Sequence, residues 1–105
     1  MTNEENEIRL LKIQLLDKKL KKAEQLINQI QETLVPENKI EHQFIFDVWR
    51  FNVMFYLSKD LAVYGIEKEF IDVVNRKFSK ESVNAGIRLL SMVCSYFEHK
   101  IANQK

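Results

Sequence analysis

The chain has 105 residues, enough for one domain with a single hydrophobic core. Hydrophobic residues make up 46% of it and charged residues 30%, but it has only two glycines and one proline. So few turn-forming residues argue against an all-β fold and favour long helices with short connections. The net charge of +1 gives no overall attraction toward nucleic acid or a membrane surface.

The cysteine content and the apolar runs indicate the cellular compartment. Cys94 is the single cysteine, so no intramolecular disulfide forms, and its neighbours Met92 and Val93 favour a buried core thiol. The polar, acidic start MTNEENE is unlike a signal peptide, and no run of 18 apolar residues occurs. We therefore expect a cytoplasmic protein that does not insert into a membrane.

Residues 7–34 lack glycine and proline and are rich in good helix formers, which predicts one long helix. A heptad repeat runs through it, and the charges beside the repeat attract each other across a parallel pair of helices. We therefore predict a coiled coil that makes the protein a parallel homodimer. Its apolar seam consists of Ile13, Leu16, Leu20, Ala23, Ile27, Ile30 and Leu34, flanked by Lys12, Asp17, Lys19 and Glu24.

A second apolar stripe on the same helix supports the alternative, in which the helix packs within its own monomer. This stripe consists of Ile8, Leu11, Leu15 and Leu26 and lies beside the seam. A two-stranded coiled coil has no use for it. One side of the helix is therefore expected to meet a partner chain, and the other side the rest of the domain.

Residues 37–64 are predicted to form the second helix, after a break at Val35–Pro36 and before a stop at Gly65. Its aromatic side chains point in nearly every direction, which is typical of a helix covered on all sides. We expect it to be central, with Trp49 and Phe55 in the core. Three apolar residues interrupt its polar strip and are either covered by another element or exposed for a partner: Met54, Leu57 and Leu61.

Two further helices are predicted at 67–78 and 80–102. Ser79 is a natural N-cap for the second of them, and Gly86 indicates a close contact between helices. The complete pattern predicts one all-α domain over residues 1–105. It is a four-helix, bundle-like domain with a long N-terminal coiled-coil helix.

Catalytic and metal-binding motifs are absent from the sequence. Neither histidine follows a glutamate at the Glu-x-x-His spacing, and there is no HExxH, GxSxG, P-loop or dinucleotide glycine motif. Cys94 lies on the apolar face of the last helix, whereas His99 lies on its polar face, so they do not form a nucleophile pair. We predict a protein that is not an enzyme and has no catalytic residue, cofactor, metal or small-molecule substrate.

With catalysis excluded, binding to another macromolecule is the function that the sequence supports. We predict a non-catalytic protein–protein interaction protein, acting as an adaptor, an assembly factor or an inhibitor on an unidentified protein partner. The alternative is a small dimeric DNA-binding regulator that uses a helix-turn-helix-like pair at 67–102. Glu81 and other acidic residues beside that pair disfavour phosphate contacts, so an ordinary antiparallel helix pair is preferred. The residues offered to nucleic acid in the alternative are Arg76, Lys80, Asn84 and Arg88.

Overall fold

The computed structural model describes residues 2–33, 39–74 and 77–104. The elements in these ranges are all helical: α1 (Asn3–Thr33), α2 (Lys39–Lys59), the 3₁₀ turn η1 (Ala62–Tyr64), α3 (Ile66–Val73) and α4 (Lys80–Gln104). The predicted all-α, bundle-like fold is therefore confirmed. The predicted hinge at Val35–Pro36 lies outside the described residues.

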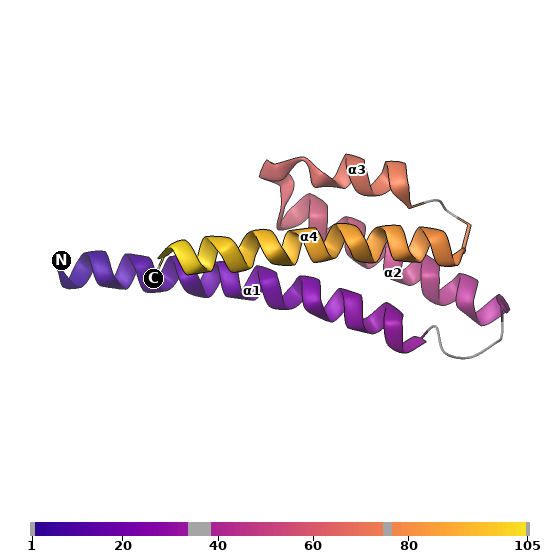
Figure 1. Cartoon of the computed structure of the whole chain (residues 1–105), viewed down its shortest axis with the longest axis horizontal. Coiled ribbons are helices and arrows are strands. Elements are labelled where there is room, and N and C mark those ends of the chain that lie inside the picture. The colour runs from indigo at the N-terminus through magenta and orange to yellow at the C-terminus, as the bar shows by residue number, and fades with distance from the viewer. Residues whose placement is uncertain (1, 34–38, 75–76, 105) are drawn as a thin grey trace.

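Helices α1 and α4 are the longest elements and form the closest helix pair (Figure 1). They run antiparallel, α2 packs along the second half of α1, and α3 folds back along α4. The molecule is elongated, measuring 57 × 25 × 18 Å. Its radius of gyration is 16.1 Å, against about 13 Å for a compact domain of this length. The elongation arises because the beginning of α1 extends beyond the other helices (Figure 1).

Local capping explains where the long helices begin. The Thr2 hydroxyl accepts a hydrogen bond from the Glu5 amide, and the Glu5 carboxylate accepts one from the Thr2 amide. This reciprocal capping box starts α1 at Asn3, four residues earlier than the sequence pattern predicted. The predicted N-cap of α4 is confirmed, because the Ser79 hydroxyl accepts from the Ser82 amide at 3.0 Å.

Helix α2 is shorter than predicted. It ends at Lys59, and the fully buried Leu61 then turns inward before η1. Gly65 follows with a φ of 67°, a left-handed conformation that glycine adopts without steric cost. The chain therefore leaves the α1–α2 layer after Lys59 and crosses to α4, so α2 covers only part of α1.

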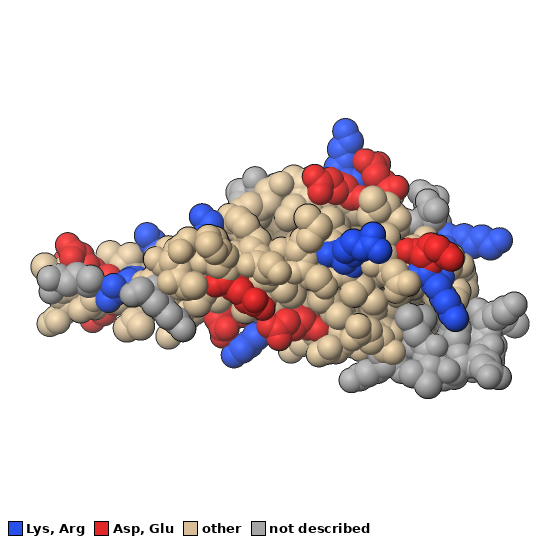
Figure 2. Space-filling view, in the orientation of Figure 1, with Lys and Arg blue, Asp and Glu red and all other residues tan. Residues whose placement is uncertain are grey.

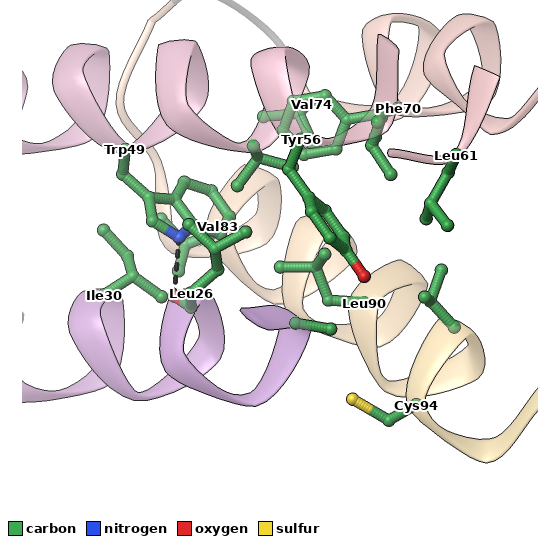
Figure 3. Close-up of a cluster of buried hydrophobic side chains, with 14 of the residues drawn as sticks. Leu26, Ile30, Trp49, Tyr56, Leu61, Phe70, Val74, Val83, Leu90 and Cys94 are labelled. Atoms are coloured by element: carbon green, nitrogen blue, oxygen red, sulfur yellow. Dashed lines mark hydrogen bonds between the residues drawn. The ribbon is translucent and has the colours of Figure 1, made fainter. Parts of the chain in front are cut away.

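The core lies where α1, α2 and α4 meet, with Phe70 of α3 beside it, and Trp49 points from α2 toward α1 within it (Figure 3). Its indole Nε1 donates a hydrogen bond to the backbone carbonyl of Leu26 at 2.8 Å. About two turns later on α2, the Tyr56 hydroxyl donates to the Lys19 carbonyl at 2.6 Å. These two bonds fix α2 against α1 and set the register between them.

Gly86 allows α4 to approach this core. A Cβ atom at Gly86 would lie 2.6 Å from Cη2 of Trp49, closer than real Cβ atoms come to their neighbours. The indole ring therefore occupies the space that a larger residue would fill. The sequence-based expectation of a close contact at Gly86 is confirmed.

Candidate interaction surfaces

The outward face of α2 carries a continuous row of exposed apolar side chains, which we name the α2 stripe. It consists of Phe44, Val48, Phe51 and Phe55, exposed to 70%, 40%, 70% and 55% respectively. Their spacing of four, three and four residues places them on one side of the helix. The opposite side of α2 faces the core through Phe46, Trp49, Val53, Tyr56 and Leu57.

The α2 stripe corrects two sequence-based expectations. Phe55 was expected in the core and is more than half exposed, whereas Trp49 was expected there and is fully buried. The helix was also expected to be covered on all sides, but only one side is covered. The 4-3-4 spacing of these residues indicates a second apolar face on the helix. Because aromatic residues occur at every angle around the helix, however, the sequence does not show which face points inward.

The predicted partner-binding residues lie elsewhere than expected. Leu57 and Leu61 are fully buried and Met54 is half-buried, packed against the core. Leu61 begins the inward turn into η1, and α3 lies beside the same part of α2. Leu57 and Leu61 are therefore core residues and do not form a partner-binding patch.

The predicted coiled-coil seam lies largely inside the monomer. Leu20, Ala23 and Ile30 are buried in the common core. Ile13, Leu16 and Ile27 are half-buried, and Leu34 lies outside the described residues. The seam assignment is corrected accordingly, because from Leu20 to Ile30 α1 uses this face for α4 and α2 of its own chain.

The charged residues predicted beside the seam also have local roles. Asp17 forms an ion pair with Lys21 at 2.9 Å, one turn away on the same helix. The Lys19 backbone carbonyl accepts the Tyr56 hydroxyl, while Lys12 and Glu24 are exposed. The Asp17 bond is the largest cause of a raised pKa of the Lys21 ammonium. It is an exposed pair and contributes little to stability.

An apolar hollow of about 260 Å³ lies between η1, α3 and α4. Tyr64, Tyr96 and Phe97 form its aromatic wall, with the Tyr64 and Tyr96 ring centroids 5.3 Å apart. Partial burial, followed by the neighbouring Tyr96 hydroxyl, raises the pKa of Tyr64. The full lining is Leu61, Tyr64, Ile66, Glu69, Leu89, Met92, Val93, Tyr96 and Phe97.

The residues offered to nucleic acid do not form a basic surface with α3. Lys80, Asn84 and Arg88 are exposed on α4, and Arg76 lies outside the described residues. Figure 2 shows basic and acidic side chains interspersed over the α3–α4 side of the molecule. Figure 1 shows α3 and α4 as antiparallel neighbours. The arrangement matches the ordinary helix pair that the sequence favoured.

The single thiol is buried against the core (Figure 3). Burial is the main reason that the pKa of Cys94 rises to about 11. The thiol is therefore protonated at neutral pH, and the thiolate is the nucleophilic form. His99 is exposed on α4, and the His42 side chain is not among those described.

The described residues contain neither a metal-binding cluster nor a helix that could span a membrane. Within residues 2–33, 39–74 and 77–104, no cluster of three histidine, cysteine, aspartate or glutamate side chains is arranged to hold a metal ion. In the same part of the chain, no helix has the length and apolar character needed to cross a membrane. Comparison of the chain with protein-family models, curated proteins and solved structures found no match.

Proposed function

We propose that this chain is a non-catalytic protein that works by binding another protein, with the α2 stripe as its main binding surface. The observation that carries the proposal is the exposure of three phenylalanines in one row: Phe44, Phe51 and Phe55. Isolated apolar residues on a surface are ordinary, but contiguous apolar patches mark interaction sites. At about 200 Å² per ring, the α2 stripe exposes roughly 450 Å² of apolar surface.

The spacing of the stripe indicates the kind of partner that fits it. Alternating steps of four and three residues are the spacing with which one helix packs along another. We therefore propose an amphipathic helix of the partner protein as the bound element. Aromatic rings at Phe44 and Phe51 are suited to the buried centre of such an interface, because phenylalanine buries a large area with few rotatable bonds.

The polar residues beside the stripe supply a charged rim. Asp47 lies toward its beginning and Lys59 at its end, and the Lys59 ammonium lies 5.3 Å from the centre of the Phe55 ring. A partner helix that places a basic residue near Asp47 and an acidic residue near Lys59 is favoured over the reverse orientation. Rim charges of this kind select the partner more than they add affinity.

The state of Cys94 supports binding in preference to catalysis. The single thiol is buried and protonated, so Cys94 supplies no nucleophile. A lone reduced thiol also fits a reducing compartment, and we propose a cytoplasmic protein. The role of an adaptor, an assembly factor or an inhibitor is consistent with a surface that binds without chemistry. We further propose that the protein self-associates through α1.

Site-specific photo-cross-linking tests the α2 stripe. A benzophenone side chain placed at position 51 is expected to give a discrete cross-linked heteromer in an extract of the source organism. The matched control is position 92 on α4, because Met92 is similarly apolar and exposed to 64%. A second arm adds the Phe44→Lys substitution, which should remove the product formed from position 51. Equal yields from positions 51 and 92 would refute the proposal.

A further inference from the structure

The first part of α1, residues 3–16, is named the arm, because it extends beyond α2. Tyr56 of α2 lies opposite Lys19 of α1, and α2 ends at Lys59. The arm therefore has α4 as its neighbour but lacks α2, and it reaches past the end of the bundle (Figure 1). Even so, it carries four large apolar side chains on its surface: Ile8, Leu10, Leu11 and Leu15. Leu10 lies on another side of the helix, whereas Ile8, Leu11 and Leu15, exposed to 53%, 58% and 60%, lie together.

These three residues share the side of α1 that packs on α2 farther along. At 100° per residue, Ile8 and Leu15 lie within about 20° of Leu26 around the helix axis. Leu26 is buried and accepts the Trp49 hydrogen bond. The arm therefore continues the apolar face that binds α2, but the chain has turned away toward η1 before α2 reaches it.

We infer that a second copy of this chain covers the arm, and that the two arms pack antiparallel about a two-fold axis. Leu11 of one chain lies against the partner's Leu15, and this contact occurs twice. The residues Ile8, Leu11 and Leu15 have the three-then-four spacing of a helix-packing seam. The two arms, with the end of α4 beside each, would then form a four-helix arrangement from two chains.

The charges along α1 select the antiparallel orientation. Its beginning is acidic, through Glu4, Glu5 and Glu7, and the region beyond the arm is basic, through Lys18, Lys19, Lys21 and Lys22. In the antiparallel register, Glu4 lies beside the partner's Lys22 and Glu5 beside the partner's Lys19. A parallel pair would instead bring the two acidic beginnings together and the two basic stretches together, and its attractive contact would be that of Glu7 with the partner's Lys12. Opposite charges at such flanking positions set the orientation of paired helices.

In this register Ile8 lies against the aliphatic stem of the partner's Lys18, and one repulsive contact accompanies the attractive ones. Lys12 lies near the two-fold axis and faces the partner's Lys12, whereas Gln14, on the other flank, faces the partner's Gln14. The attractive contacts of Glu4 and Glu5 occur twice each, so they outnumber the single lysine pair. Lys12 is exposed and keeps its ammonium in water.

The area available is that of a weak, reversible dimer. Ile8, Leu11 and Leu15 together expose about 300 Å² of apolar surface per chain, at roughly 180 Å² for each side chain when free. With the stems of the flanking lysines and glutamates, the interface reaches about 1,000 Å² in total, the lower limit for a specific complex. The inference replaces the parallel coiled coil expected from the sequence, because from Leu20 to Ile30 that seam packs on α4 and α2 of the same chain.

Sedimentation or light scattering on the full chain tests the dimer. At about 100 µM, a concentration suited to an interface of this size, the wild type should show twice the chain mass of 12.5 kDa. Leu11→Glu should give the single-chain mass with unchanged helicity, because Leu11 is exposed. Met92→Glu and Phe51→Glu, which alter other exposed apolar sites, should remain dimeric. A single-chain mass for the wild type, or a dimeric Leu11→Glu, would overturn the inference.

Cysteine trapping tests the orientation. A Gln14→Cys variant should form a disulfide-linked dimer on mild oxidation, because position 14 faces its copy across the axis. A Glu4→Cys variant should not, because the two copies of position 4 lie about 27 Å apart in the antiparallel register. The parent protein, whose Cys94 is buried, is the control. Linkage through position 4 but not position 14 would show a parallel pair and overturn the inference.

Binding of a partner protein by the α2 stripe and pairing of two arms can each be refuted without the other. If Phe51→Glu abolishes partner cross-linking but leaves the dimer intact, the α2 stripe binds another protein and the arm binds a second copy. If Phe51→Glu also gives single chains, the stripe itself is the dimer interface, and the arm pairing is wrong. If the dimer persists while positions 51 and 92 cross-link equally, only the binding role of the α2 stripe is wrong.

Discussion

Gly86→Ala should destabilise the wild-type protein but not a Trp49→Phe variant. The added Cβ would lie 2.6 Å from Cη2 and 3.2 Å from Cζ3 of Trp49, both on the six-membered ring of the indole. Relieving this overlap requires a shift of about 1 Å in a ring that is fully buried, and overpacking of this kind costs about 1–3 kcal/mol. Alanine is a better helix former than glycine, which offsets up to about 1 kcal/mol of this loss in stability. The net loss should be about 1–2 kcal/mol.

Trp49→Phe by itself should cost about 2–3 kcal/mol. It removes the hydrogen bond to the Leu26 carbonyl, worth about 1 kcal/mol. It also leaves a void of about 40 Å³, which at roughly 24 cal/mol per Å³ adds about 1 kcal/mol beyond the lost burial. The shorter phenylalanine ring does not reach the space beside Gly86. In that background Gly86→Ala should be neutral or stabilising by up to about 1 kcal/mol, limited by Val74 at 3.2 Å.

Urea unfolding followed by far-ultraviolet circular dichroism measures all four variants of this cycle, because helix content reports unfolding without the tryptophan. The expected coupling energy is about 2 kcal/mol in favour of the double variant. Asn84→Ala, at an exposed position on the same helix, is the matched control and should have the same small effect in both backgrounds. If Gly86→Ala costs the same in both backgrounds, within about 0.5 kcal/mol, the indole is not seated on Gly86.

Three further outcomes follow from burial. Phe46→Ala should cost about 3–5 kcal/mol, because Phe46 is fully buried, whereas Phe55→Ala should cost about 1 kcal/mol; equal losses in urea unfolding would contradict the assigned faces of α2. Leu20→Glu should abolish cooperative thermal unfolding, because it places a carboxylate in the core; a folded single chain would contradict this. Cys94 should react with a thiol reagent only after denaturant is added. Because the pKa of Cys94 is raised from 9.0 to about 11, its contribution to stability should be present below pH 9 and lost as pH rises from 9 to 11. Rapid labelling of the native protein, or the same alkaline loss in Cys94→Ala, would contradict this.

The existence of the helices could be predicted from the sequence, because long segments without glycine or proline leave few other structures. Their ends were harder to place. The capping box of Thr2 and Glu5 precedes the apolar repeat of residues 7–34, so the start of α1 was placed four residues too late. The early end of α2 has no glycine or proline at Lys59. It depends on the burial of Leu61, a tertiary contact that no local pattern contains.

The faces of the helices could not be assigned from the sequence alone. Helix α2 has apolar residues at nearly every angle, so periodicity did not show whether Leu57 or Phe51 points inward. Helix α1 has a heptad repeat, but the same repeat serves a partner chain or a neighbouring helix of the same chain. The structure assigns the face at Leu20 to the monomer and leaves Leu11 and Leu15 exposed. Both ambiguities arise because the hydrophobic effect is non-directional. An apolar face can therefore pack on its own chain or on a partner with the same sequence pattern.

The exposed surface of the molecule connects the α2 stripe with the arm. A monomer of this mass exposes about 6,200 Å², whereas this chain exposes 7535 Å². The difference of about 1,300 Å² reflects the elongated shape, and the α2 stripe and the arm together expose about 750 Å² of apolar surface within the total. Neither region is required by the core, because Trp49 and Leu26 already fix α2 on α1. Exposed phenylalanine and leucine favour nonspecific aggregation, so their presence in two rows supports the proposals that the α2 stripe binds a partner protein and that the arm binds a second copy.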